Sequence, residues 1–270
     1  MPELPEVEIT KRGVKQFFLG DALKKMTLRQ PKLRWTVPEQ TKQCLGSVLL
    51  DVHRRSKYIV LDFGTQVQLI HLGMSGALRI VSPDEPWRKH DHIEWVFDRG
   101  AMRLHDPRRF GSVDWCLLRD LASYPKWLHL GVEPFSEAFT VQHLQCAMRL
   151  KRTPIKSLIM GGKAVVGVGN IYASEALFLS GVRPGRASGR VSKQHIQRLH
   201  AAILSVLSQA IEQGGSSLRD FHALEGELGY FQQSCWVYGR QGQPCKVCGT
   251  PIKNKVIAQR ASFYCSVCQQ

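Results

Sequence analysis

The runs Cys245-Lys246-Val247-Cys248 and Cys265-Ser266-Val267-Cys268 are separated by sixteen residues. Each run places two sulfur atoms on one tight turn, and two such turns can complete a tetrahedron around a metal ion. This spacing is typical of zinc ribbons. Because four thiolates leave no open coordination position, we predict one structural Zn²⁺; a pair of disulfide bonds is the alternative. The expected ligands are Cys245, Cys248, Cys265 and Cys268.

The other four cysteines are scattered singly along the chain, a pattern typical of buried thiols in a reducing compartment. They are Cys44, Cys116, Cys146 and Cys235. Residues 1–12 carry charges and lack the apolar stretch of a signal peptide. No run approaches the roughly 20 apolar residues that cross a membrane. We therefore expect a cytoplasmic protein that is associated with the nucleoid.

The chain is strongly basic, with 37 Lys and Arg against 22 Asp and Glu and a formal net charge of +15. Such an excess favours a polyanionic partner. A basic protein that its charge merely keeps in solution is the alternative. The basic pairs Arg54-Arg55, Arg108-Arg109 and Lys151-Arg152 lie between apolar segments. This placement indicates a folded basic surface and not a disordered arm.

The segment from about residue 22 to 118 consists of short apolar or alternating runs separated by glycines. Such runs are typical of strands in an antiparallel sandwich or barrel. A helix is expected before them, with Pro5 near its first turn and Gly20 past its end. The runs are 48–52, 58–63, 67–71, 93–97 and 113–117.

After a linker expected at 128–139, the hydrophobic period becomes helical. Thr140 is expected to cap a short helix, Thr153-Pro154 to begin a second, and Asn170 to cap a third. Ser192 should open the longest helix, which Gly214 closes.

These patterns predict an α+β multidomain protein. We expect a first domain at 1–130, formed by a helix and an antiparallel β-sandwich. A helical domain should follow at 131–222. The remainder, 223–270, should contain a loop region and the zinc hairpin.

Two glycine-rich stretches do not match nucleotide-binding motifs. Gly161-Gly162-Lys163-Ala164 lacks the Ser or Thr with which a P-loop holds magnesium. Gly167-Val168-Gly169 lacks the third glycine and the βαβ context of a dinucleotide site. We therefore expect no nucleotide cofactor. A start of a helix at Asn170 would suit a phosphate, although an ordinary helix cap is the alternative.

The N-terminus offers a possible nucleophile. If Met1 is removed, Pro2 becomes a secondary amine, and α-amino groups have a pKa of about 7.7–8.0. Such an amine can attack a carbonyl-type carbon to give an iminium intermediate. Glu3 follows directly and could transfer protons. A helix start with acidic residues in its first turn is the alternative interpretation.

Several motifs, spread in order from residue 2 to residue 268, together resemble the bacterial formamidopyrimidine-DNA glycosylases of the Fpg/Nei family. Each motif alone has low specificity, whereas the combination is highly specific. Besides the zinc hairpin with Gln259-Arg260-Ala261, they are Met1-Pro2-Glu3-Leu4-Pro5-Glu6-Val7-Glu8, His71-Leu72-Gly73-Met74-Ser75-Gly76, Lys89-His90-Asp91-His92, Asp106-Pro107-Arg108-Arg109-Phe110-Gly111 and Val166-Gly167-Val168-Gly169-Asn170-Ile171-Tyr172-Ala173.

The resemblance implies a β-sandwich domain, a helix–two-turn–helix domain and a zinc finger. It implies a bifunctional base-excision-repair enzyme that excises 8-oxoguanine and formamidopyrimidines and then cuts the abasic strand by β,δ-elimination. The implied partner is damaged double-stranded DNA, and we expect a monomer.

The resemblance also implies catalytic roles. Pro2 corresponds to the nucleophile that forms a Schiff base with C1′, and Glu3 to the general acid/base. Lys57 matches a lysine that contacts a phosphate and donates a proton during β-elimination. Arg260 matches an arginine associated with phosphate binding and δ-elimination.

Six further residues match positions that contact DNA in the family. Met74, Arg108 and Phe110 correspond to residues that fill the gap left by the extruded nucleotide, as apolar wedges and an arginine can. His90, Lys151 and Asn170 match polar or phosphate contacts. Without the resemblance, Met74 and Phe110 would be interpreted as core residues, and Arg109 competes with Arg108 for the base contact.

The chain departs from the family pattern in one segment. It has Leu228-Gly229-Tyr230-Phe231 where Pro-Gly-Tyr-Phe is common, and Glu225-Gly226 where Asp-Gly is common. This segment corresponds to a loop that closes over the damaged base. Two alternatives remain: an endonuclease VIII-type glycosylase for oxidised pyrimidines, which usually begins Pro-Glu-Gly-Pro-Glu, and a non-catalytic zinc DNA-binding protein.

Overall fold

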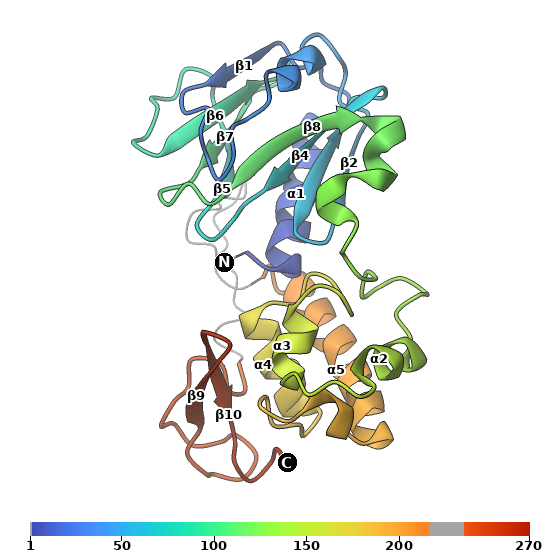
Figure 1. Cartoon of the computed structure of the whole chain (residues 1–270). Helices are drawn as coiled ribbons and strands as arrows, with labels where there is room; N and C mark the ends of the chain where they lie inside the picture. Colours follow the sequence, from blue (N-terminus) through green and yellow to red (C-terminus); the bar gives the residue numbers. More distant parts are fainter. Residues whose placement is uncertain (1, 216–234) are drawn as a thin grey trace. The chain divides into compact units, whose positions relative to one another are not determined.

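A computed structural model of the chain describes residues 2–215 and 235–270 (Figure 1). Its internal contacts divide the described residues into two units. Unit 1 contains residues 2–128 together with 214–215, and unit 2 contains residues 129–213 and 235–270. Each unit has a hydrophobic core of its own. The residues of the predicted base-closing loop, 216–230, lie outside the described part.

The first helix, α1 (Leu4–Phe18), begins at a reciprocal pair of carboxylates. The backbone N–H of Glu3 donates to Oε2 of Glu6 at 2.8 Å, and the Glu3 side chain accepts from the backbone of Glu6. This capping box satisfies amide groups that the first turn of a helix leaves without intrahelical partners. Pro5 lies in the first turn, as predicted, and Gly20 follows the helix with a φ of +87°.

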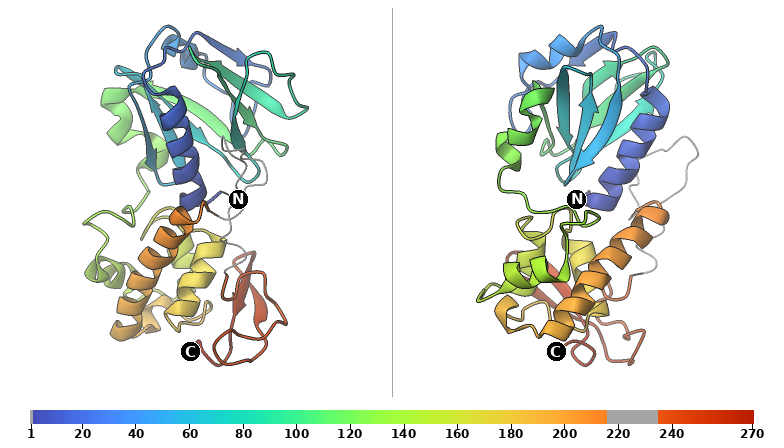
Figure 2. Two further views of the ribbon diagram at one scale, coloured as in Figure 1. Left: turned by 180° about the vertical axis from the view of Figure 1, so that it is seen from behind. Right: turned by 90° about the vertical axis from the view of Figure 1, so that its right-hand side faces the viewer.

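Eight strands form two antiparallel four-stranded sheets in unit 1, in the orders β1-β6-β7-β5 and β2-β3-β4-β8. The sheets bury a shared core to which both contribute, and α1 runs along β2 (Figure 2). The strands are β1 (Lys25–Leu28), β2 (Asp51–Arg55), β3 (Tyr58–Asp62), β4 (Gln66–His71), β5 (Ala77–Val81), β6 (Asp91–Val96), β7 (Ala101–His105) and β8 (Ser112–Leu117).

The predicted β-sandwich is confirmed, and four of the five predicted runs coincide with β3, β4, β6 and β8 to within two residues. The run at 48–52 is displaced, because β2 begins only at Asp51. Strands β1, β5 and β7 were not predicted from the sequence. Strand β5 carries the buried Arg79 and strand β7 the buried Arg103, at positions where the strand pattern predicts an apolar residue.

Three short 3-10 segments complete unit 1: η1 (Glu39–Cys44), η2 (Leu118–Ser123) and η3 (Pro125–Trp127). Tyr124, between the last two, packs with Val60, Val67 and Leu69 on a second apolar cluster. The η2–η3 segment therefore lies over the β3–β4 part of the second sheet.

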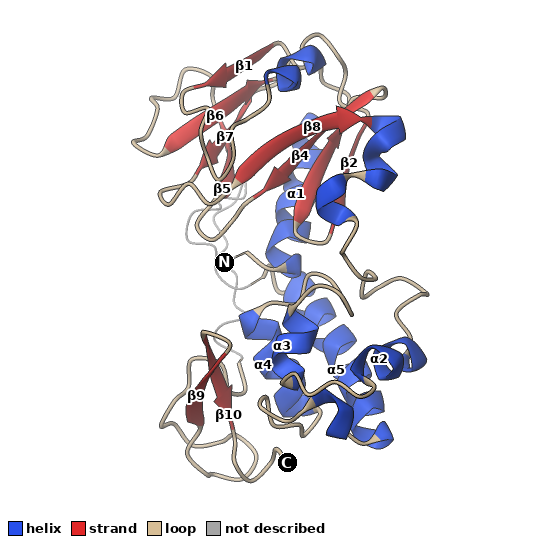
Figure 3. Ribbon diagram, in the orientation of Figure 1, coloured by secondary structure: helices blue, strands red, loops and turns tan. Residues whose placement is uncertain are grey.

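Unit 2 is mainly helical (Figure 3). Its core gathers apolar side chains from every helix, with Leu177 of α4 and Leu199 and Ile203 of α5 among the most buried. The helices are α2 (Val141–Met148), α3 (Ile155–Met160), α4 (Asn170–Leu179) and α5 (Lys193–Glu212), with a short η4 (Ser188–Arg190) before α5.

Two of the four predicted helix starts are confirmed. Oγ1 of Thr140 accepts from His143 N–H at 3.0 Å, and Oγ of Ser192 accepts from His195 N–H at 3.4 Å. The other two predictions were wrong by one residue. Gly169 is the N-cap of α4, so Asn170 is its first helical residue and not its cap. Pro154 is the N-cap of α3, with Thr153 outside it.

After the helices, unit 2 contains a hairpin of β9 (Lys253–Ile257) and β10 (Arg260–Tyr264). Both turn residues, Ala258 and Gln259, are left-handed, with φ of +46° and +58°. Two left-handed central residues define a type I′ turn, whose twist matches that of the flanking strands. Cys245 and Cys265 pack beside Ile252 in a small apolar cluster that includes Phe178 of α4.

A buried carboxylate joins this region to α4. Glu175, 1% exposed, accepts from the backbone N–H groups of Trp236, Val237 and Tyr238 at 2.7, 3.1 and 2.8 Å. Burial raises the pKa of Glu175, and the three donors oppose that shift. The chain therefore enters the zinc hairpin from a fixed point on α4.

No helix among residues 2–215 and 235–270 is long and apolar enough to cross a membrane. Of the single cysteines, Cys44 and Cys235 are buried and Cys116 is half-buried. Cys146 is exposed, so the prediction of a buried thiol was wrong there.

Replacing Glu175 with Ala should lower the free energy of unfolding by about 2 to 4 kcal/mol, because it leaves buried N–H donors without their acceptor. Urea unfolding followed by circular dichroism measures the change. Glu175→Gln keeps one acceptor oxygen and should cost less. Equal losses for the two variants would contradict the proposed hydrogen-bonding role.

Candidate functional site

The candidate nucleophile and acid lie at the start of α1, where Pro2 and Glu3 are both buried. Glu3 is 2% exposed, and its backbone and side chain both belong to the capping box with Glu6. The cap fixes the backbone that carries the carboxylate directly beside Pro2. The helix-start interpretation is confirmed, and it does not exclude the catalytic interpretation, because the capping residue directly follows Pro2.

Lys57 occupies the two-residue turn between β2 and β3. Ser56, the other turn residue, has a φ of +56°. Arg54 binds the carboxylate of Glu8 on α1 at 3.1 Å and donates to the carbonyl oxygen of Ser56 at 2.8 Å. Burial would raise the pKa of Glu8, but hydrogen bonds from Lys11 and Arg12 and the charge of Arg54 hold it below its usual value. An ionised Glu8 thus ties the Lys57 turn to α1.

His71, at the end of β4, lies next to this turn. Its ring centroid is 4.9 Å from that of Tyr58, its partner in the sheet. Burial first, and then the positive charges of Lys57, Arg34 and Lys126, lower its pKa to about 4. The neutral ring accepts at Nδ1 from Gly73 N–H, at 3.0 Å. No role for His71 was predicted from the sequence; its hydrogen bond to Gly73 anchors the loop that carries Met74.

Two loops carry the predicted gap-filling residues, and Asp106 joins them. The 72–76 loop contains Met74, and the 106–111 loop contains Arg108 and Phe110. The buried Asp106 carboxylate accepts from Ser75 Oγ–H at 2.6 Å and from Gly111 N–H at 2.7 Å.

The two loops also meet at Gly73. A Cβ atom there would lie 2.3 Å from the backbone carbon of Phe110, closer than real Cβ contacts allow. Gly73 also has a φ of +66°. The two loops therefore form one fixed structure.

The side chains on this structure are exposed to different extents. Phe110 is 41% exposed, and Cζ of Arg108 lies 4.6 Å from its ring centroid. Met74 is half-buried. The backbone of Arg109 has a left-handed conformation, with a φ of +54°. Phe110 is therefore no core residue, and Arg108, not Arg109, packs on its ring.

His90 lies where the 106–111 loop begins, and its carbonyl oxygen accepts from Asp106 N–H at 3.0 Å. The ring of His90 is half-buried, 5.8 Å from that of His105. Nε2 of His92 is 2.8 Å from the carbonyl oxygen of Asp106, which gives this histidine a structural role. Among the described residues no cluster containing histidine could hold a metal ion.

The remaining candidates belong to unit 2. Lys151 is exposed, beside a pocket of about 450 Å³ that Thr153, Ser157 and Lys163 also line. Asn170 begins α4, and its Oδ1 is buried and has no hydrogen-bond partner within residues 2–215 and 235–270. A buried acceptor without a donor is costly, so a ligand or water that donates to it would be stabilised there.

Arg260 is the first residue of β10 and is exposed. Behind it, the ammonium group of Lys156 on α3 donates to the carbonyl oxygen of Ala261 and to Oγ of Ser262, each at 2.9 Å. Lys156 is 1% exposed. This lysine was not predicted from the sequence, because its position in a helix gives no sign that it reaches the hairpin.

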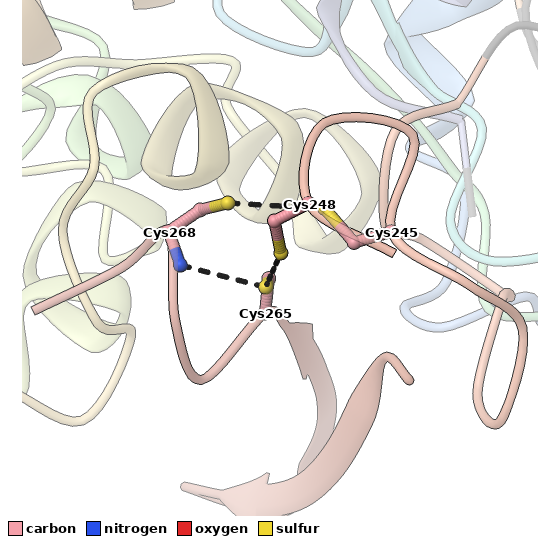
Figure 4. Close-up of side chains that lie close together, drawn as sticks. All are labelled: Cys245, Cys248, Cys265 and Cys268. Atoms are coloured by element: carbon pink, nitrogen blue, oxygen red, sulfur yellow. Dashed lines mark hydrogen bonds between the residues drawn. The ribbon is translucent and has the colours of Figure 1, made fainter. Parts of the chain in front are cut away.

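The four paired cysteines converge at one point (Figure 4). Their sulfur atoms all lie within 4.8 Å of one another, and the sulfurs of Cys248 and Cys265 are 3.4 Å apart. Sulfur atoms at such spacing fit the corners of a tetrahedral zinc site. The cluster fits one structural Zn²⁺, as predicted from the spacing.

Three family models match the chain in sequence. The formamidopyrimidine-DNA glycosylase N-terminal domain matches residues 1–113, and the H2TH domain of the same enzymes matches residues 130–222. The zinc finger found in FPG and IleRS matches residues 242–270.

Similar proteins cover the whole chain. A formamidopyrimidine-DNA glycosylase from Thiobacillus denitrificans is 50% identical over 272 residues, covering 100% of both chains. The crystal structure of MutM (FPG) from Thermus thermophilus has a TM-score of 0.90 at 36% identity, covering 99% of this chain and 98% of the other. Lactococcus lactis Fpg in complex with DNA containing an abasic site has a TM-score of 0.93 at 31% identity, covering 99% of each chain.

The depressed pKa of His71 predicts a pH-dependent stability. As pH falls from 6.5 towards about 4, the unfolded chain takes up this proton before the folded chain does, so the free energy of unfolding falls. Urea unfolding at pH 7 and pH 5 should show a smaller acid-induced loss in His71→Gln than in the wild type. An equal loss would contradict the assignment.

Removing zinc with a chelator should unfold the hairpin and leave unit 1 folded, because the sandwich has a separate core. We expect DNA binding to be lost first and any activity as a consequence. Gel-shift assays with near-ultraviolet circular dichroism test the order. Full DNA binding by the zinc-free protein would refute it.

Proposed function

Because the chain belongs to the formamidopyrimidine-DNA glycosylase family, we propose that it excises 8-oxoguanine and formamidopyrimidines from duplex DNA and then cuts the abasic strand by β,δ-elimination. Members of this family combine glycosylase and AP lyase activity. The observation that carries the proposal is the placement of Pro2 directly before Glu3, a buried carboxylate that a capping box fixes at the start of α1.

Pro2 acts as the nucleophile in this proposal. Its amine forms a bond to C1′ of the damaged nucleotide as the bond between C1′ and the base breaks. The C1′–O4′ bond then breaks, O4′ takes up a proton, and the opened sugar is left with an iminium ion at C1′. This iminium ion acidifies the proton on C2′, so that the 3′-phosphate can be eliminated. One amine thus serves both base excision and strand cleavage.

Three further residues assist. Glu3 transfers protons as general acid and base. Lys57, held at the β2–β3 turn, contacts a phosphate beside the lesion and donates a proton during β-elimination. Arg260, backed by Lys156 and the zinc cluster, binds a flanking phosphate and supports δ-elimination. The buried contacts behind Arg260 support this role, because a phosphate contact gains from a fixed cation.

The nucleotide must leave the helix stack before it can react, at a cost of a few kcal/mol. Met74 and Phe110 fill the gap as apolar wedges, and Arg108 binds the orphaned base. Asp106 joins the two loops that carry these residues. This contact supports the proposal that the loops have their final positions before DNA binds.

His90, Lys151 and Asn170 contribute polar and phosphate contacts. The buried, unsatisfied Oδ1 of Asn170 supports a donor at that point, such as a water that bridges to DNA.

With zinc bound as the structural ion, we propose domains at 1–130, 131–222 and 223–270. We further propose that the protein acts as a monomer at the nucleoid.

Borohydride trapping tests the chemistry. The protein mixed with a duplex that contains 8-oxoguanine should give a reduced covalent adduct, because borohydride fixes the iminium formed by Pro2. The yield with a thymine glycol duplex should be much lower. Denaturing gel electrophoresis with labelled DNA measures both.

Pro2→Gly keeps a terminal amine and should trap weakly. Glu3→Gln should lower the rate of base excision by about 100-fold or more, because general acid–base catalysis typically contributes at least that factor. Preferential trapping with thymine glycol would favour an endonuclease VIII-type enzyme. No adduct with either duplex would leave a non-catalytic DNA-binding protein.

A further inference from the structure

Trp35 is an exposed aromatic residue flanked by two cations. Its side chain is 44% exposed. Cζ of Arg34 lies 4.5 Å from its ring centroid, and Nζ of Lys126 lies 4.2 Å from it. Both distances are within the range of cation–π attraction. Segments about ninety residues apart in the sequence therefore meet at one indole ring.

The positive charge at this ring exceeds the negative charge beside it. Lys126 is paired with Asp114 at 2.7 Å, and Tyr124 also donates to that carboxylate. Within residues 2–215 and 235–270, no carboxylate forms an ion pair with Arg34. Two like charges gathered on one ring repel each other, and an anion that bound both would relieve the repulsion.

The ring lies next to the residues proposed to bind DNA. The backbone N–H of Arg34 donates to the carbonyl oxygen of Gly111 at 3.1 Å, at the end of the Arg108–Phe110 loop. The charges of Arg34, Lys126 and Lys57 all act on His71, whose pKa they help to lower. The two cations on Trp35 therefore lie close to the 106–111 loop, and they act on the same histidine ring as Lys57 does.

We propose that Arg34 and Lys126, held on the ring of Trp35, form an additional phosphate-binding site for DNA in unit 1. The ligand is a phosphodiester group of the strand that continues past the phosphate contacted by Lys57. This inference rests on the function proposed above, because it extends the DNA contact surface of the same enzyme.

Trp35 is a positioning residue in this site. An exposed Lys or Arg side chain loses rotamer freedom when it binds a phosphate, which weakens the contact. The indole ring holds both cations beforehand and so reduces that loss. Arg34 is exposed and Lys126 is half-buried, so both charged groups remain accessible to solvent and to a ligand.

The salt dependence of DNA binding measures the number of phosphates that the protein neutralises. The slope of log K against log salt concentration is about −0.9 per phosphate on duplex DNA. Arg34→Gln should therefore make the slope shallower by about 0.9 on an abasic-site duplex. Trp35→Ala should shift it in the same direction, and Trp35→Phe, which keeps an aromatic ring, should stay close to wild type.

Arg29→Gln is the matched control. Arg29 is an exposed cation whose Cζ lies 5.7 Å from the ring centroid of Trp87. Its replacement should leave the slope of log K against log salt concentration unchanged. A wild-type slope in Arg34→Gln would overturn the site, and a wild-type slope in Trp35→Ala would overturn the positioning role. Thermal melting checks that each variant is folded.

Borohydride trapping separates this test from that of the proposed function. Wild-type protein that traps 8-oxoguanine DNA, combined with an unchanged slope in Arg34→Gln, would refute the additional site alone. Wild-type protein that neither traps nor binds DNA would refute both.

Discussion

The buried carboxylate of Asp106 determines the geometry of the proposed DNA-binding surface in unit 1. It is 0% exposed, and it accepts from a hydroxyl group of one loop and a backbone amide of another. Hydrogen bonds to a charged group contribute roughly 1.5–3 kcal/mol each, more than neutral ones. Because both loops bind the same carboxylate, neither can move without breaking a buried charged contact. The loops that carry the proposed wedge residues Met74 and Phe110 are therefore held in place before any ligand arrives, which reduces the ordering cost of binding.

In unit 2, buried side chains of both charge signs hold backbone segments in place, as Asp106 does in unit 1. The carboxylate of Glu175 holds the backbone that enters the zinc hairpin, and the ammonium group of Lys156 holds β10 next to Arg260. Zinc holds the two Cys-x-x-Cys turns together. The buried side chains of Lys156 and Glu175 hold the hairpin region against α3 and α4. A buried charge is costly unless its hydrogen bonds are satisfied. The hydrogen bonds given above join both residues to backbone or hydroxyl groups, so two side chains fix the positions of whole segments.

The sequence predicts those parts of the fold that depend on local pattern. The sandwich, the caps at Thr140 and Ser192 and the zinc ligands follow from alternation, capping chemistry and spacing. β5 and β7 escape prediction because Arg79 and Arg103 point into a buried network, where Asp91 and Glu94 neutralise them. Arginine in a strand indicates a solvent-facing position unless its partner is known, and these partners lie on another strand. The start of α4 was misplaced by one residue because Gly169 caps it without a side chain, so no sequence signal distinguishes it from Asn170.

The candidate site shows the same division between local and long-range information. Pro2, Lys57, Arg108 and Arg260 could be named from motifs, because each lies in a short stretch with a recognisable pattern. His71, Lys156 and the Arg34–Trp35–Lys126 cluster could not, because their roles arise from contacts between segments distant in sequence. Of the four residues named from motifs, Arg108 and Arg260 are exposed, Lys57 is half-buried and Pro2 is buried. Several of those found only in the structure are buried or packed groups that hold the first set in place, and their substitution would alter geometry before it altered chemistry. A sequence pattern alone therefore identifies what can react, while the folded contacts decide whether it is positioned to do so.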